Sequence, residues 1–198
     1  MKNIILASQS PRRRMLLNML GLDFVSIAAD TEEDFLPGEG ALQAARRIAR
    51  QKALLVGSSL REGIVIAADT VVCCEGELMG KPLDDEDAFI KLSRLSGRSH
   101  QVITAVCLVD AATQEEETIS EITKVYFRTL SPQEIEAYIA TGEAKDKAGA
   151  YGIQGRAAVF AEKIEGCYYN VVGLPLSSLY LLLKKHGLDL WGGHWSQA

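Results

Sequence analysis

Strand-like and helix-like segments alternate along the first half of this chain, and this alternation limits its fold more than any other feature. Residues 3–7 are apolar and β-prone, and Pro11 stands where a first helical turn would begin, so a strand and then a helix at 12–20 are expected. A second strand at 22–28 and an Ala-rich helix at 41–56 follow. Because helices separate the strands, the first half predicts an α/β unit.

Direct turns between strands enter in the second half. The apolar run GIVIAADTVVCC leads into a turn around Gly76, and residues 99–110 and 118–128 predict a long antiparallel pair joined by a polar turn. The remaining expected elements are helices at 84–95, 131–140 and 175–186 and strands at 157–164 and 167–172. Because helical crossovers and hairpins both occur, we expect an α/β fold with a long mixed sheet. It forms one domain over residues 1–198, with a loose tail at 192–198.

The charge balance excludes two classes of partner. The 198-residue chain has 21 Lys and Arg against 26 Asp and Glu, and its formal net charge of −5 opposes binding to nucleic acid or to an anionic membrane surface. No apolar run approaches the ~20 residues of a membrane span. The four cysteines contain no C-x-x-C pair and the three histidines lack zinc-site spacing, so we expect reduced thiols in a cytoplasmic protein. A polyanion bound here has to be small and held in a local basic pocket.

A basic cluster, SQSPRRR, follows the first expected strand. Hydroxyls and exposed N–H groups at a strand-to-helix turn, with arginines in the first helical turn, favour an anion site. Adjacent helical residues point in different directions, so at most two of the arginines reach one ligand, and we leave Arg14 to the surface. The alternative is a solvated helix start, which is less favourable because positive charge at this end opposes the helix dipole.

A single acidic residue, Asp69, interrupts the apolar run IVIAADTVV. A buried, unpaired carboxylate is costly, so such a residue is expected at a strand end, where it holds a cation or acts as a base. The alternative is a bulge or turn that Asp69 and Thr70 form between two strands. We favour the functional interpretation, because an acid in so apolar a setting needs a partner.

Three further segments carry groups suited to a nucleotide. GELMGKPLDD matches a phosphate-binding loop only in part, because its spacing is one residue short and a proline replaces the hydroxyl, but it still presents Lys81. In DKAGAYGIQG the glycines permit close backbone approach, Lys147 could reach a phosphate and Gln154 could read a base edge. A flexible loop is the alternative there. Glu33, in an acidic loop, and Lys52, late on the Ala-rich helix, would each pass as surface charge, although carboxylates beside phosphate suit Mg²⁺.

Together these segments resemble the Maf family of nucleoside triphosphate pyrophosphatases. The resemblance runs from ASQSPRR at residue 7 to VVGLPL at residue 176, and it includes AADTVV, MGKP, LSGRSHQVITAV, FRTL, DKAGAYGIQG and NVVGLP in order. It implies a fold like that of the inosine triphosphate pyrophosphatases, with two α/β lobes about a long mixed sheet and the substrate in a central cleft. It also implies cleavage between the α- and β-phosphates, which gives a nucleoside monophosphate and pyrophosphate.

The same resemblance implies roles for particular residues. Asp69 would be the proton acceptor and a neighbour of a divalent metal, Mg²⁺ or Mn²⁺, which Glu33 would also hold. The residues implied to hold the triphosphate are Ser8, Arg12, Arg13, Lys52, Lys81 and Lys147. Arg12, Thr70 and Gln154 match the specificity positions of the branch that acts on dTTP and UTP, so we expect a pyrimidine substrate. A homodimer is expected on the resemblance alone.

Two other functions remain compatible with these residues. One is a house-cleaning pyrophosphatase for purines of the ITP or XTP type on the same fold, which a panel of nucleotides would separate. The other is a nucleotide-binding regulator of cell division, whose effect would survive Asp69→Asn. An enzyme is favoured because attack on a phosphorus surrounded by negative oxygens needs cations, a metal and a carboxylate, and the sequence supplies candidates for the protein groups.

Overall fold

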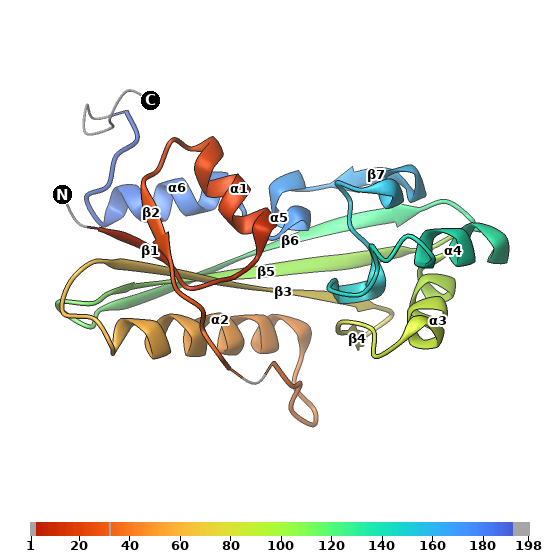
Figure 1. Cartoon of the computed structure of the whole chain (residues 1–198), viewed down its shortest axis with the longest axis horizontal. Coiled ribbons are helices and arrows are strands. Elements are labelled where there is room, and N and C mark those ends of the chain that lie inside the picture. The colour runs from red at the N-terminus through yellow and green to blue at the C-terminus, as the bar shows by residue number, and fades with distance from the viewer. Residues whose placement is uncertain (1–2, 32, 192–198) are drawn as a thin grey trace.

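The computed structural model describes residues 3–31 and 33–191, and the tail expected at 192–198 lies outside them. Within the described part of the chain, seven strands form one mixed sheet in the order β2-β1-β3-β5-β6-β7, with β4 paired to β3 (Figure 1). The strands are β1 (Ile4–Leu6), β2 (Phe24–Ser26), β3 (Ile64–Cys74), β4 (Glu77–Met79), β5 (Ser99–Asp110), β6 (Glu116–Phe127) and β7 (Ala161–Glu165). β1 lies parallel to β2 and β3, and the other pairs are antiparallel, which confirms the predicted mixed α/β fold.

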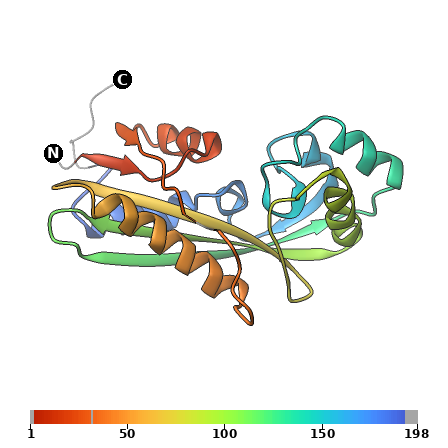
Figure 2. The same ribbon diagram turned by 60° about the horizontal axis from the view of Figure 1, so that its bottom comes forward.

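Most of the helices lie toward one or the other end of the long strands, and α5 lies between them (Figure 1). The α-helices are α1 (Pro11–Met19), α2 (Ala41–Gly57), α3 (Asp85–Leu95), α4 (Pro132–Ile139), α5 (Tyr168–Val172) and α6 (Leu176–Lys185), and the 3₁₀ helices are η1 (Ala148–Ala150) and η2 (Arg156–Phe160). At one end α2 covers one face of the sheet, while α1 and α6 lie on the other face (Figure 1, Figure 2). At the opposite end lie α3, α4 and β7 (Figure 1). β3, β5 and β6 connect these two groups, which correspond to the two expected lobes.

Small residues bring α2 close to the sheet. Ala45, Ala49 and Ala53 recur every four residues, which places them on one helix face, and all three are fully buried against β3 and β5. At the end of the helix, a Cβ added to Gly57 would lie 2.9 Å from Cγ1 of Val109, so only glycine fits there without a shift. This close packing lets a lysine on α2 reach a side chain on β3.

Capping groups set the starts of two helices. Ser131 Oγ accepts the N–H of Glu134 (3.3 Å), and the Glu134 carboxylate accepts the N–H of Ser131 (2.8 Å), so the predicted capping box is confirmed at α4. α1 begins at Pro11, and the side chain of Ser10 accepts the N–H of Arg13 (3.4 Å). The arginine cluster therefore lies in the first turn of a helix that directly follows β1.

The strand predicted at 167–172 is wrong, because this segment forms the short helix α5. Its Tyr and Val residues are β-prone, but hydrogen bonds to β5 decide the conformation. The fully buried Asn170 donates from Nδ2 to the carbonyl of Val102 (2.9 Å) and accepts with Oδ1 from the N–H of Thr104 (3.1 Å). Gly173, with φ of +122°, ends the helix.

The strand predicted at 157–164 begins too early. Its first residues belong to η2, and β7 starts only at Ala161. Ala157 and Phe160 are the buried residues of η2, and their spacing of three is the period of a 3₁₀ helix. An apolar run this short does not distinguish a strand from a helical turn by its pattern alone.

The cysteines carry free thiols in the structure. All four cysteines are free, with Cys74 and Cys107 buried and Cys73 and Cys167 partly buried. Over residues 3–31 and 33–191, every helix is too short or too polar to cross a membrane.

Candidate functional site

A single cleft of about 1130 Å³ brings together every site residue that the sequence predicted. All ten predicted residues are among those that line it: Ser8, Arg12, Arg13, Glu33, Lys52, Asp69, Thr70, Lys81, Lys147 and Gln154. Ser8 stands between β1 and α1, Arg12 and Arg13 on α1, Glu33 between β2 and α2, Lys52 on α2, and Asp69 and Thr70 on β3. Lys81 stands between β4 and α3, Lys147 directly before η1 and Gln154 between η1 and η2. Their roles stay predictions, but their convergence on one cleft is an observation.

Asp69 lies inside β3, paired in register with Ala105 of β5. The expected strand end is therefore wrong, and so is the alternative of a bulge or turn, because β3 continues through both Asp69 and Thr70. Asp69 is 7% exposed, and Nζ of the equally buried Lys52 donates to its Oδ1 at 2.8 Å. This lysine from α2 supplies the partner that lets a carboxylate remain in the middle of an apolar strand.

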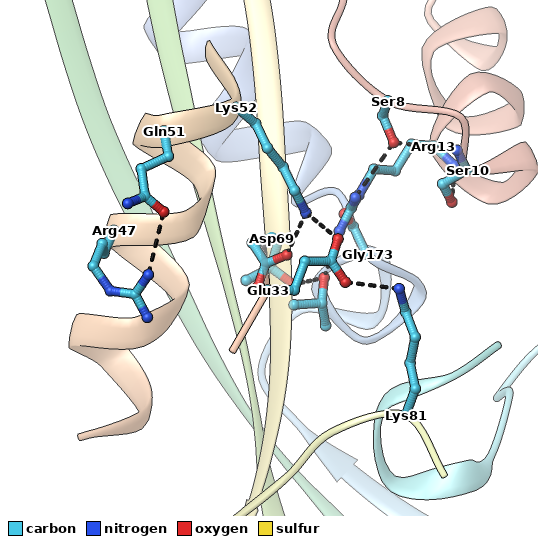
Figure 3. A network of polar contacts seen from close by, with 12 residues as sticks. Ser8, Ser10, Arg13, Glu33, Arg47, Gln51, Lys52, Asp69, Lys81 and Gly173 are labelled. Carbon is cyan, nitrogen blue, oxygen red and sulfur yellow. Dashed lines mark hydrogen bonds and ion pairs between the residues drawn. The ribbon is translucent and has the colours of Figure 1, made fainter. Parts of the chain in front are cut away.

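Glu33 joins two lysines of the cleft, Lys52 and Lys81. Its Oε1 accepts from Lys52 Nζ at 2.6 Å and its Oε2 accepts from Lys81 Nζ at 2.7 Å (Figure 3). Burial alone would raise the pKa of Glu33, but the two ammonium groups outweigh it and lower the pKa to about 2. The Lys52 ammonium thus lies between two carboxylates, those of Glu33 and Asp69.

Burial raises the pKa of Asp69, although the positive charges of Lys52 and Arg13 oppose the shift. The carboxylate is therefore a stronger base than an exposed aspartate. A proton acceptor works best when its pKa is closer to the working pH. The environment of Asp69 favours the predicted role.

Arg13 braces three segments around the cleft. Its guanidinium donates to the carbonyl of Gly173 (2.9 Å) and, through the other two nitrogens, to the hydroxyls of Thr70 (3.1 Å) and Ser8 (3.4 Å). The Thr70 hydroxyl in turn lies 3.0 Å from that of Thr104 on β5. Sequence reasoning gave no role to Gly173 or Thr104, although both stand in segments that carry the resemblance. Arg13 fixes the start of α1 against β3 and the end of α5.

Asp146 is a charged cleft residue to which sequence reasoning gave no role. Its Oδ2 accepts from Arg12 (3.2 Å) and its Oδ1 from Lys147 (2.5 Å), whose Nζ also donates to the carbonyl of Glu143 (2.6 Å). The one sequence signal for Asp146 is its place in the segment DKAGAYGIQG, next to Lys147. Its side chain is 62% exposed, so a bound anion can replace it at both cations.

The cleft combines charged and apolar walls. Arginine and lysine side chains from four segments lie among the carboxylates of Glu33, Asp69 and Asp146, and such an arrangement suits a small polyanion and keeps the buried acid available as a base. Val102, Tyr151, Ile153 and Val172 also line the cleft and offer apolar surface against which an uncharged ring can pack. The site therefore suits a phosphate chain attached to an aromatic group.

The described residues hold no group of three or more His, Cys, Asp or Glu that could bind a metal by themselves. The carboxylates of Glu33 and Asp69 nevertheless converge on one cation, the Lys52 ammonium. Mg²⁺ is commonly held by one or two carboxylates together with substrate phosphates. These two residues fit such an ion.

The comparisons with known proteins identify the family. The family described as Maf-like protein matches residues 3–186. The chain is 54% identical over 185 residues to a dTTP/UTP pyrophosphatase of Syntrophomonas wolfei subsp. wolfei, with 93% of this chain and 98% of the relative covered. It is 47% identical over 184 residues to a dTTP/UTP pyrophosphatase of Carboxydothermus hydrogenoformans, with the same coverage of 93% and 98%. This chain belongs to the Maf family.

Two solved structures show a weaker likeness. The Ham1 protein of Staphylococcus aureus aligns with a TM-score of 0.45 and 18% identity, over 64% of this chain and 72% of that one. A nucleoside-triphosphatase, named dITP/XTP pyrophosphatase, of Mycobacterium abscessus aligns with a TM-score of 0.38 and 18% identity, over 72% of this chain and 96% of that one.

Proposed function

We propose that this protein hydrolyses dTTP and UTP between the α- and β-phosphates and releases the nucleoside monophosphate and pyrophosphate. The observation that carries the proposal is the buried pair of Asp69 and Lys52 in a cleft lined with cations. The relatives named dTTP/UTP pyrophosphatase, at 54% and 47% identity over nearly their whole length, support the choice of nucleotide.

The cations of the cleft bind the triphosphate and neutralise its charge. Arg12 and Lys147 exchange the carboxylate of Asp146 for phosphate oxygens, and Lys81 exchanges that of Glu33. Each cation is already held in place by its carboxylate, so little rearrangement accompanies binding. Fixed positive charges in a partly enclosed cleft stabilise the additional charge that develops on the phosphate in the transition state.

Asp69 accepts the proton of the attacking water. Lys52 holds Oδ1, and we assign the water to Oδ2. The water oxygen forms a bond to the α-phosphorus while the bond from that phosphorus to the oxygen bridging to the β-phosphorus breaks. The water proton passes to Asp69, and pyrophosphate leaves with the bridging oxygen. The raised pKa of Asp69 increases the driving force for the proton transfer.

A divalent metal completes the proposed site. Glu33 and Asp69 would hold Mg²⁺ or Mn²⁺ together with the phosphates of the substrate. When bound, the ion supplies positive charge that neutralises the phosphate oxygens. Lys52 donates to both carboxylates, and its ammonium has a third N–H, which we expect to point to the phosphates when metal and substrate are present while the contact with Oδ1 of Asp69 is kept.

Gln154 would select the base. It is an exposed residue of the cleft and offers both a donor and an acceptor, which is what reading the edge of a pyrimidine requires. Thr70 and Arg12 are the other two expected specificity residues. We also expect a homodimer, and a location in the cytoplasm, where free thiols such as those of this chain stay reduced.

The test is pyrophosphate release from a panel of nucleoside triphosphates, with and without Mg²⁺ or Mn²⁺. We expect metal-dependent release that is fastest with dTTP and UTP. Arg12→Ala should weaken binding, and Arg14→Ala is the matched control, because Arg14 is an exposed neighbour on the same helix. Preferred turnover of ITP or XTP would keep the chemistry and refute the pyrimidine assignment, whereas nucleotide binding without turnover would favour a regulator.

A further inference from the structure

A buried polar pair contacts the loop that carries Lys147 and Gln154. His100, on β5, is 2% exposed, and its Nε2 lies 2.8 Å from the hydroxyl of Tyr151. Tyr151 stands between Lys147 and Gln154 in the chain and itself lines the cleft. His100 itself is not among the described residues that line the cleft. The pair connects a strand of the sheet to the segment that faces the nucleotide.

Aromatic rings hold this pair in a fixed orientation. The His100 ring packs edge-on against Phe127 (4.9 Å between centroids) and against Tyr151 (5.3 Å). Phe127 and Tyr151 also pack edge-on at 4.8 Å, so the three rings contact one another in turn. The ring of Tyr151 therefore has little freedom to move while His100 and Phe127 keep their places.

Burying the imidazole of His100 costs free energy, which its hydrogen bond to Tyr151 offsets. Nδ1 of His100 is buried and has no hydrogen-bond partner among the described residues. Burial lowers the pKa of His100 to about 4, so the ring is neutral near pH 7. An apolar side chain would fill the same space without burying an unpaired nitrogen. The hydrogen bond to Tyr151 is what the imidazole provides and an apolar side chain would not.

Two more contacts hold the same loop on either side of Gln154. The hydroxyl of Tyr138, on α4, accepts the N–H of Gly152 (3.2 Å), and the carboxylate of Glu143 accepts the N–H of Arg156 (2.9 Å). Together with the pair, they fix the backbone at positions 151, 152 and 156. The direction in which Gln154 points depends on these anchors.

Lys147 depends on the same segment. A Cβ added to Gly152 would lie 2.6 Å from Cε of Lys147, so the lysine side chain packs directly on the backbone at Gly152. A shift of this backbone would therefore disturb the phosphate-facing lysine as well as Gln154. Asp69 and Lys52, on β3 and α2, are anchored independently of the loop.

We propose that His100 is a positioning residue for nucleotide selection, which through its hydrogen bond to Tyr151 fixes the loop that presents Gln154 to the base. This inference rests on the proposed function and deepens it. Without the hydrogen bond the loop can adopt other positions, so the substrate binds more weakly and the base is read less strictly. Asp69 and Lys52, which lie outside the loop, keep their places.

The test compares His100→Leu, Tyr151→Phe and the double variant in kcat and KM for UTP, dTTP and CTP. We expect each single variant to raise KM for UTP and dTTP about three- to tenfold and to reduce the preference over CTP by a similar factor, with kcat changed less. The double variant should be no worse than the poorer single variant, because both changes remove one hydrogen bond. His100→Gln, which can still pair with the hydroxyl, should recover most of the preference.

Tyr126→Phe is the matched control, because it removes a hydroxyl that donates to the exposed Glu165 at the far side of the sheet. Hydrogen exchange adds a measurement that needs no turnover: the amides of residues 147–156 should exchange faster in Tyr151→Phe than in wild type, and not in Tyr126→Phe. If His100→Leu fails to fold, Tyr151→Phe still provides both tests.

Several results would overturn the inference. One is an equal loss in kcat for all nucleotides with an unchanged preference between bases. Another is a loss in the double variant equal to the product of the losses in the two single variants. The third is an unchanged rate of amide exchange at residues 147–156 in Tyr151→Phe. A wild-type protein that releases pyrophosphate from no nucleotide would instead refute the proposed function. The exchange measurement would then still decide whether the pair fixes the loop.

Discussion

Replacing Asp69 by asparagine should abolish activity without destabilising the fold. Asparagine keeps the shape of the side chain, and its oxygen can still accept from Lys52, which retains its 2.6 Å contact with Glu33. Since burial outweighs the attraction of the neighbouring cations and raises the pKa of Asp69, removing the charge relieves an unfavourable interaction. We expect the free energy of unfolding at pH 7 to equal that of wild type or to exceed it by about 1 kcal/mol. Loss of a general base should lower kcat by about 10²- to 10⁴-fold.

The pH dependence follows from the direction of the same shift. A group with a raised pKa in the folded state favours folding when protonated, so its contribution is present below the unfolded pKa, near 3.8, and is lost as the pH rises through the folded pKa. Asparagine resembles the protonated acid at every pH. The stability advantage of Asp69→Asn should therefore be greatest at neutral pH and should vanish below about pH 4.

Urea unfolding followed by circular dichroism, at pH 7 and at pH 4, measures both effects, and pyrophosphate release measures kcat. A loss of more than about 2 kcal/mol at pH 7 would mean that the Asp69 carboxylate is net stabilising, which contradicts the raised pKa. A kcat within tenfold of wild type would show that another group accepts the proton.

Further changes should separate the roles of the neighbouring groups. Lys52→Met removes the nearest cation from the buried Asp69 and should cost roughly 3–5 kcal/mol of stability in urea unfolding, whereas a loss below about 1 kcal/mol would show that the pair is not tightly coupled. Gln154→Ala should relax the preference between bases more than it slows the best substrate, and equal losses on every nucleotide would assign Gln154 to the phosphates instead. Chelation of divalent metal should stop turnover and addition of Mg²⁺ or Mn²⁺ should restore it, so full activity in chelator would refute the metal requirement. Burial lowers the pKa of His100 from 6.5 to about 4, so the wild-type protein should lose roughly 3 kcal/mol of stability as the pH falls across that interval. His100→Gln should lose less, and the same loss in both proteins would contradict the lowered pKa of His100.

The sequence was informative where local chemistry dominates. The capping box at Ser131 and the proline at the start of α1 gave helix starts to within a residue. Arg12, Arg13 and Asp69 could be predicted because they stand at a strand-to-helix turn or interrupt an apolar run, where a charged side chain is conspicuous. The roles of Glu33 and Lys52 depended on the family resemblance, because each would otherwise pass as surface charge. All ten line one cleft.

The predictions that were wrong or missing concern residues whose partners lie far away in the chain. Asp69 was expected at a strand end because its partner Lys52 lies 17 positions away on a helix, and nothing local indicates that the two meet. The pattern of the α5 segment predicts a strand, because the hydrogen-bond partners of Asn170 on β5, Thr104 and Val102, lie 66 and 68 positions away in the chain. His100 looked like an ordinary strand residue, since its partner Tyr151 follows 51 positions later.

The most direct test of the proposed reaction is the fate of the water oxygen. UTP is hydrolysed in water enriched in oxygen-18, and the products are separated and weighed by mass spectrometry. Attack on the α-phosphorus predicts UMP that carries the label and pyrophosphate that does not. Labelled pyrophosphate would mean attack on the β-phosphorus, and UDP with inorganic phosphate would mean cleavage at the other anhydride, and either result would contradict the proposed mechanism.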